Sequence, residues 1–209
     1  MTTFWTPPLF YNNFAHISSK KQTMSKREQI LQTTLELITE LGFHATPMSL
    51  IIKKSEVAAG TIYHYFESKE QLIDTLYNEI KAEMGKAIIQ DISEYQNYKD
   101  KFTAILKNLF YFFIQNPKKF EFIENYSNSP LVYKEIKAIN RRHYQEAIDF
   151  IESGISIGIL RKMPVLLILN LIFGNISTLV KMILHEEINY SEELLEITIQ
   201  CSWDSIKIV

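Results

Sequence analysis

Residues 42–72 read GFHATPMSLIIKKSEVAAGTIYHYFESKEQL. This stretch predicts two short helices with a tight turn between them. Thr46-Pro47 predicts the start of a helix, with the threonine as its N-cap and the proline in its first turn, where a missing N–H costs nothing. That helix is expected to end near Ser55, with a tight turn at Glu56-Val57 and a new helix from about Ala59. Two short helices joined in this way are typical of a helix-turn-helix motif.

The helices on either side of this motif begin with capping boxes, in which the N-cap and the third helical residue satisfy each other's backbone N–H groups. Residues 25–28, SKRE, predict a helix over residues 26–41, and Gly42 is expected to provide its C-terminal cap. Residues 68–71, SKEQ, open a longer helix. Apolar residues recur at helical spacing in both helices. These are Ile30, Thr34, Leu37, Ile38 and Leu41 in the first, and Leu72, Leu76 and Ile80 in the second.

This ordered series resembles the TetR/AcrR family of bacterial transcriptional regulators. The matching features are Gly42-Phe43 after the first helix, Thr46 before the second, Gly60-Thr61-Ile62-Tyr63 in the third, then Tyr65-Phe66 followed by Ser68-Lys69-Glu70. The resemblance implies an all-α fold, with an N-terminal three-helix helix-turn-helix DNA-binding domain followed by a helical ligand-binding and dimerisation domain. It also implies a sequence-specific regulator of transcription, a repressor that a small-molecule effector releases from its operator.

A recognition helix presents its N-terminal residues to base edges and buries its opposite face. Ile62 and Phe66 lie one turn apart and are expected to face the core. Lys69 stands in the first turn of its helix, where its charge opposes the helix dipole and a bound phosphate would offset the cost. Tyrosines and a histidine on a short helix are also common as ordinary surface or core residues. With the resemblance, the predicted DNA-binding set is Thr46, Ala59, Gly60, Thr61, Tyr63, His64, Tyr65 and Lys69.

Four positions depart from the family pattern, three of them within residues 55–58, which read SEVA where the pattern has Ala-Gly-Val-Ser. Glu56 replaces a glycine that tolerates a left-handed backbone, at a cost of roughly 1 kcal/mol. Ala58 replaces a serine that would cap the recognition helix, again at roughly 1 kcal/mol. Ile52 replaces a small alanine, so the two short helices must pack differently. These changes bear on the operator contacts more than on the fold.

From about residue 82 the pattern changes to longer, more apolar helices, with cores expected at residues 102–114, 120–126, 130–154, 164–184 and 192–208. The last two are predicted to pair across a two-fold axis in a homodimer. Small residues allow close approach of the helices there, at Gly174, Ser177 and Thr178. The alternative is that both helices only complete the core of one protomer.

Aromatic residues are dense in the middle helices, and Phe110–Phe113 cover every face of theirs. Such residues either fill the core or line an apolar pocket with a few polar groups, suited to a small hydrophobic or cationic ligand. On the second interpretation, the predicted effector site consists of Phe110, Phe113, Phe122, Tyr126, His143 and Asn175.

Residues 1–23 contain aromatic residues and prolines without helical or alternating periodicity. We expect a disordered leader there, with Met24 as the native start. The alternative is a genuine arm that brings Lys20 and Lys21 near the DNA backbone. The expected division of the chain is therefore a leader at 1–23, a DNA-binding domain at 24–70, and an effector and dimerisation domain at 71–209.

The composition excludes several classes of protein. Cys201 is the single cysteine among 209 residues, which leaves no disulfide framework and favours a reducing cytoplasm. The apolar region around residues 163–184 is interrupted by polar residues, so no membrane span is predicted. The five histidines lack metal-ligand spacing, and no catalytic motif or cofactor site is recognisable. The net charge of −2 leaves open a second function, a helical protein-interaction module of the same fold without specific DNA binding.

Overall fold

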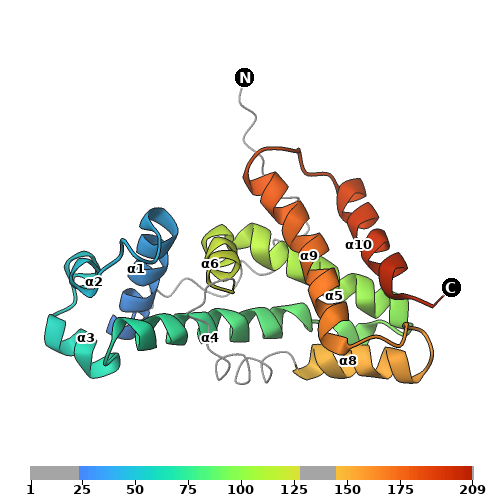
Figure 1. Cartoon of the computed structure of the whole chain (residues 1–209), viewed down its shortest axis with the longest axis horizontal. Coiled ribbons are helices and arrows are strands. Elements are labelled where there is room, and N and C mark those ends of the chain that lie inside the picture. Colours follow the sequence, from blue (N-terminus) through green and yellow to red (C-terminus); the bar gives the residue numbers. More distant parts are fainter. Residues whose placement is uncertain (1–23, 128–144, 209) are drawn as a thin grey trace.

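The computed structural model describes residues 24–127 and 145–208, and within these ranges every regular element is a helix. Figure 1 shows the first three helices gathered at one end of the molecule and the C-terminal helices at the other, with α4 running between them. The predicted all-α fold is confirmed. The N-terminal helices are α1 (Lys26–Leu41), α2 (Met48–Ser55), α3 (Ala59–Tyr65) and α4 (Lys69–Ile88). The others are η2 (Ile92–Glu94), α5 (Tyr98–Gln115), α6 (Pro117–Ser127), α8 (Gln145–Ser156), α9 (Val165–Leu184) and α10 (Glu192–Ile206).

Helix α1 has the bounds and the cap that its sequence predicts. The Ser25 side chain accepts from the Glu28 N–H, and the Glu28 carboxylate accepts from the Ser25 N–H at 2.8 Å. Gly42 follows the helix with a φ of +84°, a backbone conformation that favours glycine, and its N–H donates to the Ile38 carbonyl. The second predicted box forms only in part, because the Gln71 side chain accepts from the N–H of Glu67 rather than that of Ser68.

The start of α2 differs from the prediction. Pro47, not Thr46, occupies the N-cap position, and no side chain caps the helix. Thr46 is fully buried, and its hydroxyl donates to the carbonyls of Gly42 at 2.9 Å and Leu37 at 3.2 Å. The prediction that Thr46 caps α2 is therefore wrong. Its hydroxyl instead satisfies carbonyls at the end of α1, which the helix leaves without internal partners.

The C-terminal helices surround α5, which packs against α4, α6, α9 and α10. Phe102, Phe110 and Phe113 on α5 are fully buried and form the middle of this core. The helix begins at Tyr98, earlier than predicted, because the Asn97 side chain caps it by accepting from the Asp100 N–H. Part of the helix predicted over residues 130–154 lies outside the described residues, and α8 starts at Gln145.

Helix α9 is long and apolar enough to cross a membrane by length and composition alone, which is also true of many core helices of soluble proteins. Its residues Ile168, Ile172 and Ile176 are buried, and the helix packs against α5, α8 and α10. One face of α9 is thus buried against its neighbours, whereas Leu167 and Leu171 on another face are exposed.

Candidate DNA-binding surface and effector domain

The turn between α2 and α3 has the backbone that the sequence predicts. Glu56 adopts a left-handed conformation with φ 55° and ψ 20°, the strained position expected at that residue. Gln29 on α1 donates from Nε2 to the Ser55 carbonyl at 2.8 Å, which fixes the end of α2. Ala58 is the N-cap of α3 and provides no side-chain hydrogen bond, because alanine has no polar side-chain atom.

Helix α3 buries one face and exposes the other. Ile62 and Phe66 are buried, as predicted. Tyr63 and Tyr65 are 50% and 41% exposed, although both are large aromatic side chains. Ala59, Gly60 and His64 are also exposed, and Thr61 is half-buried. Six of the eight predicted DNA-binding residues therefore lie on one short helix whose outer face is open.

Gly60 provides a more specific clue. A Cβ atom built at this position would have no neighbouring atom within 4 Å, and its φ is not in the left-handed region. The packing of the protein therefore does not require glycine there. A glycine on an exposed helix costs about 1 kcal/mol relative to alanine. Close approach of an external partner to the helix backbone would explain it.

Lys69 makes internal contacts that the sequence did not suggest. Its Nζ donates to the Phe43 carbonyl at 2.5 Å and lies 4.6 Å from the centre of the Phe43 ring. Partial burial lowers the pKa of Lys69. These contacts join the start of α4 to the loop between α1 and α2. They explain a cation in the first turn of a helix without a bound phosphate.

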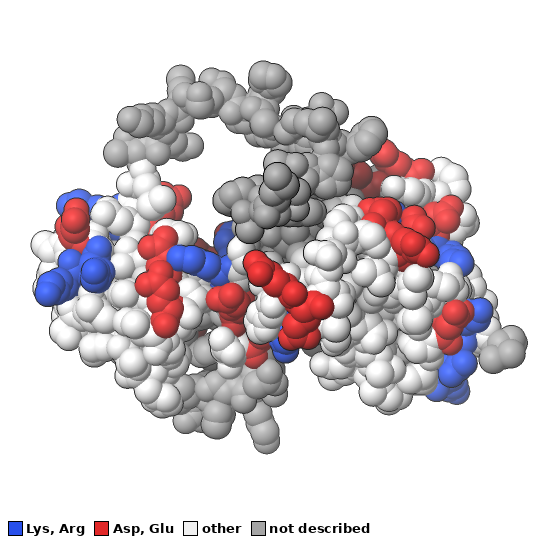
Figure 2. Space-filling view, turned by 90° about the horizontal axis from the view of Figure 1, so that it is seen from above, with Lys and Arg blue, Asp and Glu red and all other residues white. Residues whose placement is uncertain are grey.

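Basic side chains occupy the end of the molecule that α2 and α3 form. Lys53 and Lys54 are exposed in the last turn of α2. Figure 2 shows basic side chains at this end with an acidic side chain beside them, and further acidic side chains nearer the middle. Glu56, Glu67 and Glu70 are also exposed near α2 and α3, so the two lysines form a local basic cluster at the end of α2 rather than a basic end of the molecule. Phosphate contacts depend on local basic residues rather than on net charge.

The six predicted effector residues do not converge on one point. Phe110 stacks on Tyr190, whereas Phe113 packs edge-on against Phe120 and Phe173. Phe122 stacks on Tyr126, and Asn175 donates to the Ser202 hydroxyl at 3.0 Å, joining α9 to α10. His143 lies outside the described residues.

Tyr126 lies at the junction with the DNA-binding helices. Its ring stacks on Phe43 with 6.1 Å between ring centres and packs against Tyr77 at 5.0 Å. Its hydroxyl donates to the Asp74 carboxylate on α4. Burial and this carboxylate both raise the pKa of Tyr126. Tyr126 therefore connects α6 to the loop before α2 through a ring contact, and to α4 through a hydrogen bond.

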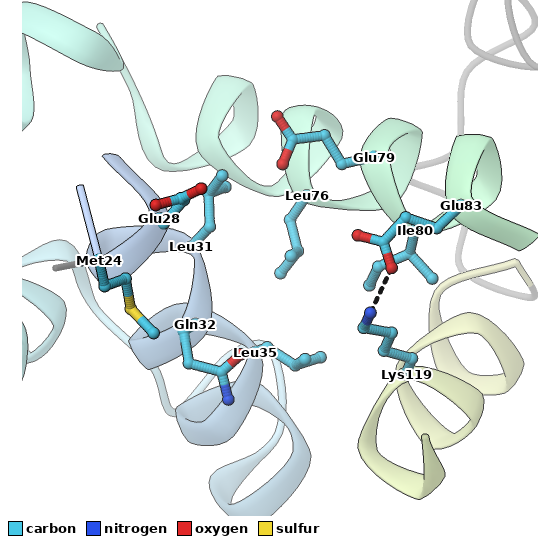
Figure 3. A pocket seen from close by; sticks show the side chains of 10 residues that line it. All are labelled: Met24, Glu28, Leu31, Gln32, Leu35, Leu76, Glu79, Ile80, Glu83 and Lys119. Carbon is cyan, nitrogen blue, oxygen red and sulfur yellow. Dashed lines mark hydrogen bonds and ion pairs between the residues drawn. The ribbon is translucent and has the colours of Figure 1, made fainter. Parts of the chain in front are cut away.

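A cleft of about 390 Å³ lies beside this junction, between α1, α4 and α6 (Figure 3). Its apolar wall is formed by Leu31 and Leu35 on α1 and by Leu76 and Ile80 on α4. At its rim Lys119 pairs with Glu83, which joins α6 to α4. Helix α1 thus contacts α4 and α6 around a partly open cleft.

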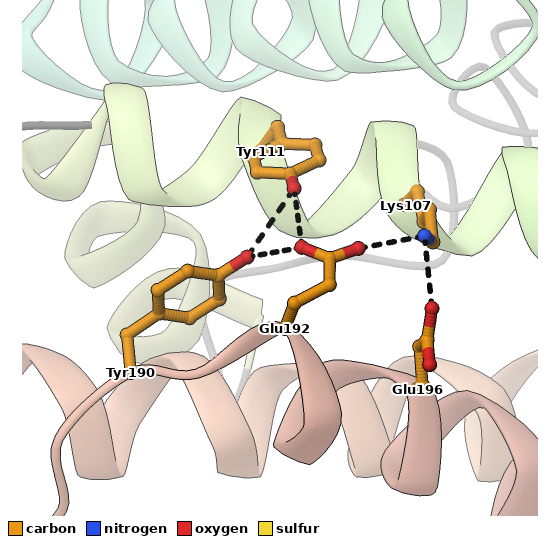
Figure 4. A network of polar contacts seen from close by, with 5 residues as sticks. All are labelled: Lys107, Tyr111, Tyr190, Glu192 and Glu196. Atoms are coloured by element: carbon orange, nitrogen blue, oxygen red, sulfur yellow. Dashed lines mark hydrogen bonds and ion pairs between the residues drawn. The ribbon is translucent and has the colours of Figure 1, made fainter. Parts of the chain in front are cut away.

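A polar network ties the start of α10 to α5 (Figure 4). Glu192 accepts from Lys107 at 2.7 Å, from Tyr190 at 2.6 Å and from Tyr111 at 3.1 Å. The hydrogen bond from Lys107 is the main cause of the lowered pKa of Glu192. This network positions the first turn of α10 against the central helix of the core.

Lys81 is the charged side chain that sequence reasoning missed. It is 8% exposed, and it is the only charged side chain among the buried residues in the described part of the chain. It follows the buried Tyr77 by four residues, the spacing of one helix face. The spacing of Tyr77 and Lys81 could have indicated a second buried face of α4, but Leu72, Leu76 and Ile80 form its more obvious apolar stripe. Because α4 is packed on both sides, it has a second inner face.

Comparisons with known proteins cover both parts of the chain. Residues 30–76 match the family described as "Bacterial regulatory proteins, tetR family". Residues 77–208 match the family described as "Tetracyclin repressor-like, C-terminal domain". Together these matches span the helix-turn-helix and nearly all of the C-terminal helices.

Two relatives illustrate the range of sequence similarity. A "Fatty acid metabolism regulator protein" of Bacillus subtilis is 34% identical over 90 residues, 43% of this chain and 46% of that protein, so the match spans about half of its length. An "Uncharacterized HTH-type transcriptional regulator" of Haemophilus influenzae is 26% identical over 183 residues, 86% of this chain and 95% of that protein.

Solved structures share the fold over most of the chain. A TetR family transcription regulator from Marinobacter aquaeolei has a TM-score of 0.82 at 23% identity, covering 88% of this chain and 96% of that one. The transcriptional regulator FadR from Bacillus subtilis, solved in complex with stearoyl-CoA, has a TM-score of 0.65 at 23% identity, covering 84% of this chain and 95% of that one.

Proposed function

This chain belongs to the TetR family of bacterial regulatory proteins, and on that premise we propose that it is a homodimeric repressor released from its operator by a small-molecule effector. It is a DNA-binding regulator of transcription, not an enzyme. Regulators of this family bind operator DNA and small-molecule ligands and act as dimers. The operator contacts, the dimer face and the effector class proposed below are specific to this chain.

The observation that carries the proposal is the open face of α3. Thr61 and His64 offer hydrogen-bonding groups to base edges, and Tyr63 adds a hydroxyl within reach of bases or phosphates. Ala59 and Gly60 let the start of the helix approach the groove closely. Tyr65, the last residue of the helix, is proposed to contact the flanking phosphate backbone.

The phosphate contacts proposed here come from the residues around α3. Lys53 and Lys54 extend from the end of α2 as exposed cations. Lys69 and Thr46 take a supporting part, because their side-chain polar atoms bind carbonyls of Phe43 and Gly42. They hold the loop and the helix ends in place, so that backbone N–H groups there are presented to phosphates.

A second copy of the chain is the proposed partner of α9 and α10. Leu167 and Leu171 on α9 are 47% and 39% exposed, and Ile197 on α10 is 51% exposed. The half-buried Gly174 and the exposed Thr178 continue the α9 face at helical spacing. Apolar residues on two neighbouring helices are suited to a four-helix bundle across a two-fold axis. Such a dimer places two copies of α3 in successive major grooves, roughly 34–36 Å apart.

Effector control is proposed to act through α6. Tyr126 at the end of this helix contacts Phe43 in the DNA-binding region and Asp74 on α4. A ligand that displaces α6 would therefore shift the loop before α2 and the start of α4 together. The spacing of the two recognition helices would then no longer match successive grooves.

An amphiphile with a long apolar chain is the effector class that we favour. The C-terminal core contains Phe110, Phe113, Phe120 and Phe122, all buried. One relative is named for fatty acid metabolism, and one protein of the same fold was solved with stearoyl-CoA. We also place the protein in the cytoplasm, where an operator is accessible.

Salt-dependent DNA binding tests the function against a helical interaction module without DNA specificity. Affinity for duplex DNA should fall steeply between 50 and 200 mM salt, because phosphate contacts release counterions. Replacing both Lys53 and Lys54 by glutamine should lower the slope of log affinity against log salt by about 2. The exposed Lys86 on α4 provides a matched control. A folded dimer without salt-dependent DNA binding would support the interaction module instead.

A further inference from the structure

Arg27 on α1 contacts two other elements at once. Its guanidinium lies 5.8 Å from the ring centre of Phe66, the C-cap residue of α3. Its Nη2 atom also pairs with Glu79 Oε1 on α4 at 2.5 Å. Arginine is suited to this double role, because its planar guanidinium stacks on an aromatic ring and donates hydrogen bonds in its own plane. The side chain therefore joins the end of the proposed recognition helix to the middle of α4.

The two contacts lie at different distances from the joint between α3 and α4. Phe66 begins the short link at residues 66–68, whereas Glu79 stands ten residues after Lys69, the first residue of α4 (79 minus 69). At 1.5 Å per residue, this length of helix spans about 15 Å. A short link alone leaves the angle between two helices free to change. A contact so far along α4 restricts that angle, because it acts at the end of a long arm.

Ring contacts continue from Phe66 to the open face of α3. The Phe66 ring adjoins that of Tyr65 with 6.2 Å between centres, and the Tyr65 ring adjoins that of His64 at 5.6 Å. Phe66 is buried, whereas Tyr65 and His64 are exposed. Close-packed side chains transmit displacements to their neighbours. The position of Phe66 therefore affects two residues that the proposed function places at the DNA.

A direct phosphate contact is the alternative role for Arg27, because arginine commonly binds phosphate in protein–DNA complexes. The side chain is 38% exposed, and that of Glu79 is 41% exposed. The observed geometry favours the internal role, since the guanidinium already has a carboxylate in its plane and an aromatic ring at its face. The paired carboxylate also weakens the attraction of this cation for a second anion.

We propose that Arg27 is a positioning residue for DNA recognition, which holds the end of α3 against α4 through Phe66 and Glu79 and does not contact DNA itself. This role rests on the proposed function, in which α3 reads the operator. It provides a second connection between α4 and the DNA-binding helices, beside the contact of Lys69 with Phe43. A movement of α4 would displace Glu79 and with it the support of Phe66.

Two kinds of DNA separate positioning from phosphate contact in Arg27→Gln. The probes are the palindromic site that the wild type enriches from random-sequence duplexes, and a scrambled duplex of the same length and composition. Affinity for the site should fall about tenfold, because an ion pair of this exposure shifts an equilibrium by a few fold and a dimer contains two such pairs.

Affinity for the scrambled duplex should stay unchanged, and so should the slope of log affinity against log salt, because both depend on phosphate contacts. Equal losses of affinity on the two duplexes, together with a lower salt slope, would identify Arg27 as a phosphate contact and overturn the proposal.

Glu79→Gln distinguishes the two roles by the sign of its effect. Removing a negative charge near DNA would by itself raise affinity, because DNA is an anion. Positioning predicts that affinity for the site falls as in Arg27→Gln, because Arg27 loses its partner. The control is Glu36→Gln on α1, a half-buried carboxylate that accepts from Gln32, and it should not lower affinity. Unchanged or higher affinity of Glu79→Gln would overturn the proposal.

The double variant Arg27→Gln/Glu79→Gln shows whether the two residues act as one unit. It should bind the site about as weakly as either single variant, because each substitution breaks the same link. Losses that multiply would mean independent roles and would contradict a shared one. All variants are compared in buffer where circular dichroism and urea unfolding show a folded dimer, so that a change in stability does not alter the measured affinity.

The proposed function and the positioning role fail in different ways. A folded wild-type dimer that enriches no site from random-sequence DNA contradicts the proposed function, and the positioning role with it. A wild type that enriches a site to which Arg27→Gln binds equally tightly contradicts the positioning role alone.

Discussion

The Tyr126 ring on α6 stacks on the Phe43 ring in the loop between α1 and α2, with 6.1 Å between ring centres and 27° between ring planes. Phe43 in turn lies under the Lys69 ammonium, and its carbonyl accepts from the same group. One phenylalanine thus connects the C-terminal domain to the start of α4 and to the loop that leads into α2. This contact is where we expect the effector-bound and DNA-bound states to differ.

Tyr126→Phe should keep the ring stacking and remove the hydrogen bond to Asp74. A carboxylate that loses a hydrogen bond in a partly buried site costs about 1–3 kcal/mol. We expect a drop of that size in the free energy of unfolding in urea, with an unchanged m-value. Tyr95→Phe, on a 43% exposed side chain, is the control and should leave stability unchanged. Equal stability of the two variants would argue against the Asp74 contact.

Gly60→Ala should separate folding from DNA binding. The new methyl group meets no atom of the protein within 4 Å, and alanine favours the helix by up to about 1 kcal/mol. Stability should therefore rise slightly. Operator affinity, measured by fluorescence anisotropy, should fall by about tenfold because the methyl group faces the groove. Retained affinity would mean that DNA does not approach the start of α3 closely.

Glu56→Gly should stabilise the protein by about 0.5–1 kcal/mol, because glycine adopts the observed φ of 55° without steric cost. Lys53→Gly, one turn earlier on α2, is the matched control. It should destabilise by a similar amount, because it places glycine in a regular helix. Urea unfolding of both variants measures the difference. A loss of stability in both would contradict the strain assigned to Glu56.

Lys81→Met should change how stability depends on pH. The folded-state pKa of about 8 lies below the ordinary 10.5, so the unfolded chain binds more protons between these values. The free energy of unfolding of the wild type should therefore rise with pH across this window. Below pH 8 the buried Lys81 is charged, and its burial lowers the free energy of unfolding by the full amount. Glu124 on α6, Lys181 on α9 and Tyr77 on α4 face the same cluster and remain in the variant.

The variant should thus be more stable near pH 7, by at most about 3 kcal/mol, and the gain should disappear above pH 10.5. Urea midpoints of both proteins at pH 7, 9 and 10.5 measure this. A variant less stable than the wild type at pH 7 would show that the buried ammonium of Lys81 supports the fold instead of weakening it.

Local signals in the sequence predicted the N-terminal fold well. The capping box at Ser25 and the spacing of Ile62 and Phe66 depend on residues within one or two turns, so the sequence alone contains the information. The same holds for the left-handed Glu56, because its place in a two-helix motif determines the backbone.

Contacts distant in the sequence could not be predicted in this way. Thr46 reads as an N-cap, but its hydroxyl binds the end of the preceding helix because the chain folds back there. Tyr126 reads as a pocket residue, but the packing of α6 against α1 brings it to Phe43, 83 positions away in the chain (126 minus 43). The sequence does not single out Lys81, because its burial depends on the packing of α5 and α6 against α4 and on Phe173 of α9 near its ammonium.

Selection of binding sites from random-sequence duplex DNA at moderate salt tests the central claim most directly. The wild-type protein and the double variant Tyr63→Ala/His64→Ala, both confirmed as folded dimers, are carried through the same selection. We predict that the wild type enriches a palindromic site with half-sites about one helical turn apart, and that the variant does not enrich it. No enrichment by the folded wild-type dimer, or the same site from both proteins, would contradict a regulator that reads DNA through α3.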